Sequence, residues 1–206
     1  MRVAGYRAIA EVGTTLVDLL IEADENDSTF DDKTVKLASP AAVDPDGHIR
    51  ITFYLYDVSV NGHMQNQQQP FDAAEGSRSG EPVYLDLRYL MTAYPTRVSG
   101  GSDDTADEHE VLGRAIQILQ DNRILTGPTI GGTFLDNETV HLSIDPDGAE
   151  QSISIWNTFD ERPYLPSVVY LATPVIIESD ESTDESPVHQ REQIHHVPDH
   201  SGAFDG

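Results

Sequence analysis

Two stretches of the chain, Ile49–Val60 and Val83–Ala93, alternate between apolar and polar residues, and this alternation constrains the fold more than any other feature. Because successive side chains of a β-strand point to opposite faces, each stretch is predicted to be a strand with one core face. In the second stretch, the core face is expected to carry Leu85, Leu87 and Tyr89. The two strands are expected to pair as antiparallel neighbours.

Helical periodicity follows in three other stretches. Apolar residues recur at spacings of three and four, which predicts helices over 9–22, 106–121 and 150–159. Thr105 and Glu108 have the spacing of a capping box, which predicts that the second helix starts there.

Further strands complete a small sheet. Thr139–Ile144 and Ser167–Ile177 are predicted strands, and Thr34–Ala38 is a short strand candidate. Pro174 cannot donate a ladder hydrogen bond, so it places the last strand at a sheet edge or at a bend. The fold class is therefore α+β, with a small mixed or antiparallel sheet flanked by helices.

The segments between these elements have the composition of turns and loops. Two Asp-Pro-Asp-Gly segments, 44–47 and 145–148, have turn chemistry. Gly127–Gly132 is expected to be a turn-rich connector. Asn61–Gly80 has no periodicity and is long for a loop inside a compact domain, so it is expected to be mobile or functional.

The C-terminal part changes character. Acidic, Ser-, Pro- and His-containing sequence with almost no core-forming residues runs to the last residue. We expect one domain over 1–178 and a flexible acidic arm over 179–206.

The charge of the chain is extreme. Its 36 acidic residues against 12 basic ones give a net charge of −24, and only two of the basic residues are lysines. Scarce lysine with spread aspartate is typical of proteins from extreme halophiles, because molar salt screens the self-repulsion. An acidic surface for a basic partner is the alternative. The sequence has no stripe of basic residues that could neutralise the phosphates of a nucleic acid, so nucleic-acid binding is disfavoured. No apolar run reaches the roughly 20 residues that span a bilayer, so no membrane partner is expected.

Sequence motifs of enzymes and metal sites are incomplete. His109-Glu110 begins like a zinc-protease motif, but Gly113 stands where the second imidazole is needed. A metal-dependent hydrolase using His48, His63 or His141 stays an alternative that only the presence of these side chains motivates. With no cysteine, the chain has no disulfide framework or thiolate site.

Two blocks of the chain resemble a known family. LDLRYLMTAY (Leu85–Tyr94) and LGRAIQILQDNRIL (Leu112–Leu125) are similar to segments of the cap or tail-terminator proteins of phage-tail-like contractile injection systems. FYLYDVSVN (Phe53–Asn61) precedes them, and Trp156 and SVVYLATPVIIES (Ser167–Ser179) follow in the same order. The resemblance covers roughly residues 8–178.

The resemblance implies a structural role and no enzymatic activity or cofactor. Proteins of this family form a homo-hexameric ring at the end of the tube distal to the baseplate, stop polymerisation of tube and sheath, and hold the last sheath ring. Tube and sheath proteins would be the partners. The particle would be assembled in the cytoplasm and could be released extracellularly. An acidic binding module unrelated to tails is a further alternative.

Candidate contact residues follow from both arguments. Arg88 and Arg114 are expected either to pair within the chain, with Asp86 or Glu110, or to bridge subunits of a ring. Asn61, His63 and Asn66 belong to a polar, uncharged patch that could form a contact surface. Val175, Ile176 and Ile177 would begin a segment that adds a strand to a sheath protein. The partner-contact candidates are Asn61, His63, Asn66, Arg88, Tyr94, Arg114, Val175, Ile176 and Ile177.

Overall fold

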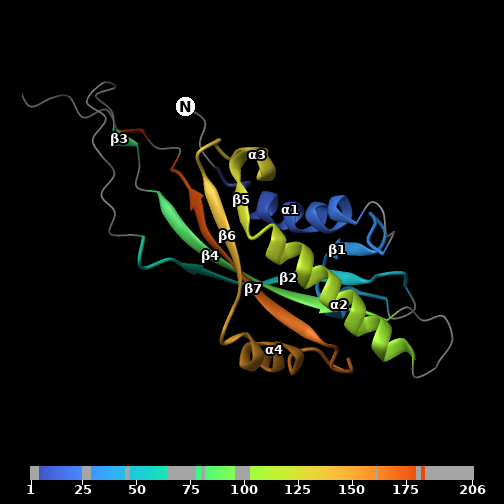
Figure 1. Ribbon diagram of the computed structural model, residues 1–206. Coiled ribbons are helices and arrows are strands. Elements are labelled where there is room, and N and C mark those ends of the chain that lie inside the picture. Colours follow the sequence, from blue (N-terminus) through green and yellow to red (C-terminus); the bar gives the residue numbers. More distant parts are fainter. Residues whose placement is uncertain are drawn as a thin grey trace, which may run out of the picture.

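The fold is built on a six-stranded sheet with the strand order β1-β2-β4-β7-β6-β5 (Figure 1). The computed structural model describes residues 5–24, 29–44, 47–64, 78–79, 82–95, 103–160, 162–179 and 182–183. The strands of the sheet are β1 (Val35–Leu37), β2 (Ile51–Val60), β4 (Val83–Ala93), β5 (Ile124–Thr126), β6 (Thr139–Ile144) and β7 (Ser167–Ile177). β1 lies parallel to β2, and the other neighbouring pairs are antiparallel. The predicted α+β class with a mixed sheet is confirmed.

Helices flank the sheet on both faces. They are α1 (Ala8–Ala23), α2 (Asp103–Asp121), α3 (Gly127–Ile130), α4 (Gly148–Trp156) and the 3-10 helix η1 (Pro40–Ala42). α1 and α2 lie side by side over one face, and α4 lies on the other side near one end (Figure 1). A separate two-stranded ladder joins β3 (Arg78–Ser79) to β8 (Ser182–Thr183). Within the described ranges, no helix has the length and apolarity needed to cross a membrane.

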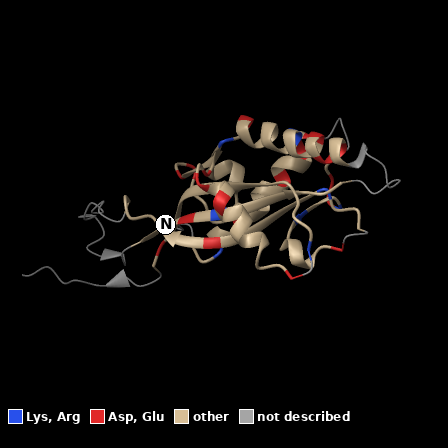
Figure 2. Ribbon diagram, turned by 90° about the horizontal axis from the view of Figure 1, so that it is seen from below, with Lys and Arg blue, Asp and Glu red and all other residues tan. Residues whose placement is uncertain are grey.

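The main core lies between the sheet and the pair α1 and α2. Val12 and Leu16 of α1 and Leu119 of α2 are fully or almost fully buried against Leu87 and Tyr89 of β4. These helix residues occupy one face at spacings of three and four, so the 3.6-residue repeat turns them all towards the strands. Acidic residues (red) are spread over helices, strands and loops rather than gathered on one side (Figure 2).

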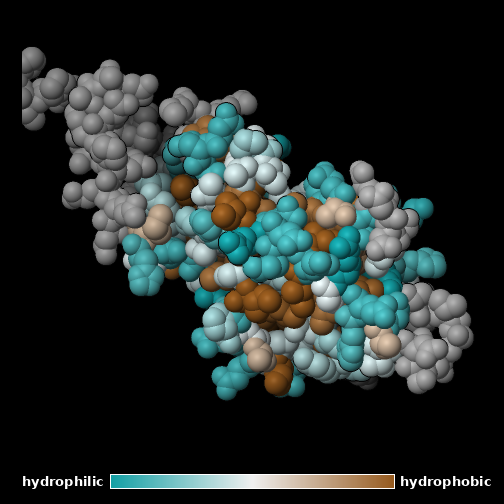
Figure 3. All heavy atoms as spheres, in the orientation of Figure 1, coloured by the Kyte–Doolittle hydropathy of each residue, from teal (hydrophilic) through white to brown (hydrophobic). Residues whose placement is uncertain are grey.

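A smaller apolar cluster covers part of the opposite face. Trp156, at the end of α4, packs on Leu90 and Val169, and its indole ring meets Phe159 edge to face at 5.5 Å. This cluster buries the second face of β4 as well, so consecutive residues from Tyr89 to Tyr94 are all buried. On the side shown in Figure 3, hydrophobic residues (brown) gather between the positions of α2 and α4.

The position of β7 corrects one of the two expectations for Pro174. β7 lies between β4 and β6 and is not an edge strand. The register shifts beside the proline: Leu85 faces Val175 and Leu87 faces Ala172, which leaves Thr173 and Pro174 opposite Asp86 alone. Such a bulge tolerates a missing donor, so a bend, and not an edge, accommodates the proline.

The start of α2 is also different from the prediction. The helix begins at Asp103, so Thr105 is inside it and the capping box does not form. A capping-box spacing alone does not fix the first residue of a helix, so helical residues can precede it. Glu108 is instead buried in the helix, and among the described residues its Oε1 atom has no hydrogen-bond partner. Burial raises the pKa of Glu108.

The expected connector at Gly127–Gly132 contains regular structure. α3 occupies Gly127–Ile130, directly after β5, which pairs with β6. A three-residue strand is too short to show alternation, so the sequence did not indicate β5. Both Asp-Pro-Asp-Gly turns are confirmed by backbone hydrogen bonds of 3.0 Å, from Gly47 N to Asp44 O and from Gly148 N to Asp145 O.

Two glycines give a matched test of the fold. A Cβ atom on Gly127 would lie 1.7 Å from the Leu135 carbonyl oxygen, whereas a Cβ atom on Gly113, inside α2, meets nothing within 4 Å. We expect Gly127→Ala to destabilise the protein by more than about 3 kcal/mol. Gly113→Ala should stabilise it by about 0.5–1 kcal/mol, because alanine favours the helix. Denaturant unfolding of both variants measures this, and equal effects would contradict the described packing.

Candidate interaction site

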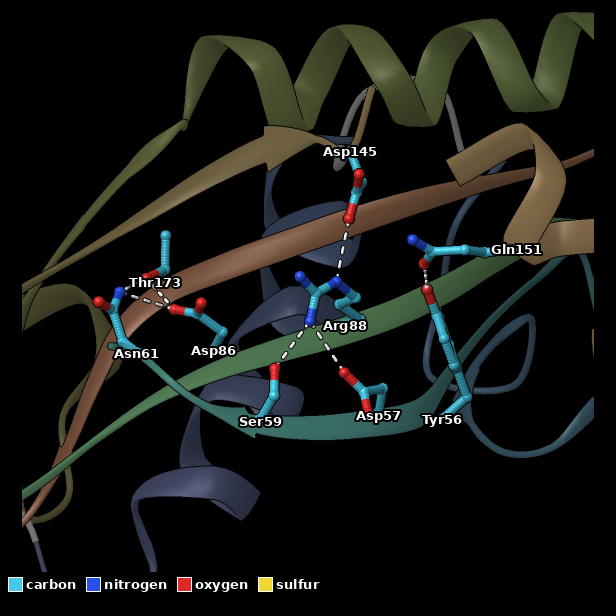
Figure 4. A network of polar contacts seen from close by, with 9 residues as sticks. All are labelled: Tyr56, Asp57, Ser59, Asn61, Asp86, Arg88, Asp145, Gln151 and Thr173. Atoms are coloured by element: carbon cyan, nitrogen blue, oxygen red, sulfur yellow. Dashed lines mark hydrogen bonds and ion pairs between the residues drawn. The ribbon is translucent and has the colours of Figure 1, made fainter. Parts of the chain in front are cut away.

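A polar network centred on Arg88 occupies the face of the sheet opposite to α1 and α2 (Figure 4). Arg88 projects from the middle of β4 between its two neighbouring strands. Its Nη1 atom donates to Asp57 Oδ2 and to Ser59 Oγ, both at 2.8 Å, on β2. Its Nε atom donates to Asp145 Oδ2 at 3.0 Å, in the turn between β6 and α4. Arg88 therefore ties three segments of one chain together.

The network is partly buried, and Asp145 is its most buried member. The side chain of Arg88 is 24% exposed and that of Asp145 only 8%, whereas Asp57 is 43% exposed. Burial by itself would lower the pKa of Arg88, but the hydrogen bonds to Asp145 and Asp57 raise it. The arginine stays charged, and the intrachain expectation is the one the geometry shows, with Asp57 and Asp145 as partners in place of Asp86 or Glu110.

Tyr56 extends the network towards α4. Its hydroxyl donates to the side-chain oxygen of Gln151 (Figure 4). Burial raises the pKa of Tyr56 to about 12, so it stays protonated and remains a donor at neutral pH. This contact places the first turns of α4 over the middle of β2.

Asn61 forms a second polar group at the bulge of β7. Its Nδ2 atom donates to Asp86 Oδ1 at 2.9 Å and to Thr173 Oγ1 at 3.1 Å, and Thr173 also donates to Asp86 (Figure 4). Its Oδ1 atom accepts from the backbone N–H of His63 at 3.1 Å. Asn61 thus fixes the turn after β2, and His63 is exposed on that turn. Asn66, the third residue of the expected patch, lies outside the described residues.

Arg114 links the two helices over the main core. Its Nε atom donates to Asp24 Oδ1 at 3.2 Å, at the end of α1. The Asp24 side chain is fully buried, and it also accepts the backbone N–H groups of Thr29 and Phe30. The pair is therefore part of the chain's own packing, with Asp24 in the place expected for Glu110.

Tyr94 lines a cavity of about 610 Å³, together with Trp156 and Arg162. Its hydroxyl is 3.2 Å from that of Thr52, and burial raises its pKa. Arg162 donates to the Ala41 carbonyl oxygen, which holds the loop after α4 against η1. The sequence indicated Tyr94 and Trp156 but not that they share a cavity, because they come from segments more than sixty residues apart.

The C-terminal candidates lie in the sheet. Val175, Ile176 and Ile177 pair with the first half of β4, and Val175 is fully buried. Their backbone on the β4 side is therefore already used within the chain. On the other side, β6 pairs with β7 only from Tyr170 to Thr173, so this edge of Val175–Ile177 pairs with no described strand. That the segment adds a strand to a sheath protein stays a prediction.

The histidines of the hydrolase alternative are separated in the fold. His48 precedes β2, His63 follows it and His141 lies in β6, and all three are exposed. Among the residues described here, no group of three or more His, Cys, Asp or Glu side chains could hold a metal ion.

Comparisons with known proteins found solved structures with a similar fold. The sheath/tube terminator of the PVC extracellular contractile injection system, in its extended state, has a similar structure, with a TM-score of 0.61 and 18% identity over 94% of this chain. The tube-terminating cap of the anti-feeding prophage is similar with a TM-score of 0.56 and 21% identity over 86%. The matches cover 65% and 58% of those two chains, so this chain spans less than two thirds of either. No curated protein matches the sequence.

A comparison of the sequence with family models shows which family the chain belongs to. The model of the Pvc16 N-terminal domain matches residues 11–191, most of the chain. The chain belongs to the Pvc16 N-terminal domain family. The family match begins in α1 and includes every strand of the six-stranded sheet.

Removing the guanidinium of Arg88 tests the polar network. We expect Arg88→Met to lower the free energy of unfolding by about 2–3 kcal/mol, because the buried Asp145 carboxylate loses its charged donor. Arg123→Met is the control: Arg123 is exposed and makes no ion pair with any described residue, so the change should stay within about 0.5 kcal/mol. Urea unfolding measures both, and an equal loss in the two variants would contradict the network.

Proposed function

We propose that this protein is a structural cap, or tail terminator, of a contractile injection system. The observation that carries the proposal is the family match over residues 11–191, together with a fold shared with two tube-terminating proteins. The polar network is consistent with it, because Arg88, Tyr56 and their partners join β4, β2 and the start of α4. The protein acts by its shape and is not an enzyme.

The proposed mechanism is geometric. Six copies form a ring that is complementary to the last layer of the tube. The ring presents no further copy of the tube surface, so polymerisation of the tube stops. The same ring holds the last layer of sheath. Tube protein and sheath protein are therefore the partners, and the particle is assembled in the cytoplasm before any release.

The unusual charge belongs to the same proposal. Six copies at −24 each repel one another strongly at low ionic strength. Molar salt shortens the Debye length to about 3 Å and removes most of that repulsion. We propose that the protein and its ring work in the high salt of a halophile's cytoplasm.

Loss of the protein tests the terminator role. In a strain that lacks it, we expect electron microscopy to show tubes that are overlong and ragged at the end distal to the baseplate, because nothing stops growth. Restoring the full-length protein should return a uniform length. Tubes of normal, uniform length without the protein would overturn the proposal.

The C-terminal arm has a separate test. We propose that residues 179–206 form an acidic arm that contacts sheath protein, held near its start by the pairing of β8 with β3 and flexible beyond it. Truncation after Glu178 should leave the tube end capped but loosen the last sheath ring, which sheath retention in isolated particles measures. Particles with capped tubes and firmly attached sheath would show that the arm has no such role.

A further inference from the structure

The sheet has a long open edge along β2. β1 pairs only with the first three residues of β2, Ile51–Phe53. From Tyr54 to Val60, β4 is the only described strand that pairs with β2. This part of β2 therefore presents backbone groups that no described strand uses, at the margin of the sheet (Figure 1).

The backbone direction along this edge can be assigned. The N–H group of Asn61 donates to the Tyr84 carbonyl oxygen of β4 at 2.8 Å. Because backbone groups alternate in direction along a strand, those of Val58 and Val60 point away from β4. Their side chains are 45% and 50% exposed. An exposed edge of this kind is a template for pairing with another chain.

The opposite margin of the sheet, at β5, also carries exposed apolar residues. Ile124 of β5 is 50% exposed and Ile144 of β6 is 46% exposed. Nine large hydrophobic residues of the described part are exposed, and four of them lie in the strands at these two margins. These four are Leu37, Val58, Val60 and Ile124, and Ile144 lies in β6, the strand next to β5. Exposed apolar residues are thus concentrated where the sheet could continue into a second sheet.

The charge pattern favours another copy of the same acidic chain as the partner. The stretch from Tyr54 to Val60 contains one acidic residue, Asp57, and Arg88 holds its carboxylate. β5 contains no acidic residue. Two chains of net charge −24 can therefore meet along these margins without placing free carboxylates against each other.

The strand directions fit such a contact. β2, β4, β7, β6 and β5 are successive antiparallel neighbours, so β5 runs in the same direction as β2. A head-to-tail repeat that continues the sheet from copy to copy brings β5 beside β2 in parallel. β1 already pairs with β2 in parallel, on the same edge.

We propose that the open edge of β2, residues Tyr54–Val60, receives β5 of a second copy as a parallel strand next to β1. Six such contacts would join the sheets of the ring into one continuous band. The inference rests on the proposed ring of six and names the surface that closes it.

Edge variants test the contact in purified protein in molar salt. Val58→Pro removes an N–H that points away from β4, and Val60→Lys adds a charge to the edge, as natural edge strands do. We expect either change to reduce the molar mass measured by light scattering roughly sixfold, from the ring to one chain. Ile153→Lys is the control: Ile153 is 55% exposed on α4, away from both margins, and the ring should persist. Circular dichroism shows whether a variant has lost its fold. If Val58→Pro has, the molar mass of Val60→Lys decides the test.

Cross-linking identifies the two partners of the contact. The chain has no cysteine, so Val60→Cys and Ile124→Cys, both at half-exposed positions, introduce the only thiols. A flexible bismaleimide should link the double variant into a ladder of multimers and leave each single variant unlinked. Dimers from Val60→Cys alone would show a two-fold contact between β2 edges and overturn the proposal.

The outcomes separate this inference from the proposed function. A ring that persists in both edge variants, or that gives no ladder, overturns the β2–β5 contact and leaves the terminator role intact. A monomeric native protein overturns the contact and the ring. A ladder together with normal tubes in the deletion strain would keep the contact and overturn the terminator role.

Discussion

The structure depends on β4, the strand that is paired along both edges and buried on both faces over its second half. Its apolar row from Leu85 to Met91 is the surface on which α1 and α2 pack. Its opposite face supplies Leu90 to the cluster around Trp156. Each large apolar side chain buried here contributes about 1.5–3 kcal/mol, so the helices on both sides are held through this one strand.

Arginine side chains connect the elements around that strand. Arg88 joins β4 to β2 and to the turn before α4, and Arg114 joins α2 to the end of α1. Arg50, just before β2, donates to Asp107 of α2 through two bonds of 2.7 and 2.8 Å. In a chain with three acidic residues for each basic one, these three arginines serve as internal links. Because these pairs are partly buried, salt that screens the surface weakens them less.

The sequence predicted the elements whose pattern is local and long. The alternation in Val83–Ala93 predicted β4, the β-branched run Ser167–Ile177 predicted β7, and the helical repeat located α1. What it could not predict depends on partners far along the chain. For an intrachain pair of Arg88, the expected partners were Asp86 or Glu110, whereas the fold brings Asp57 and Asp145 to it from distant segments. The predicted start of α2 was wrong for a related reason, because a capping-box spacing does not show whether the helix continues upstream of it.

The two irregularities of the sheet lie close together. The register of β2 against β4 shifts between Leu55 and Asp57, and that of β7 against β4 shifts between Leu85 and Leu87. Asp57 faces Arg88, so the two bulges lie within a few residues of the same guanidinium. Bulges bend their strands and increase the local twist. Both bulges therefore concentrate bending and twist of the sheet along the line of Arg88. The strand ends that carry Val60, Val83 and Ile177 lie on the far side of this line from the part of the sheet under α1 and α2, so the bend sets the direction in which these ends face.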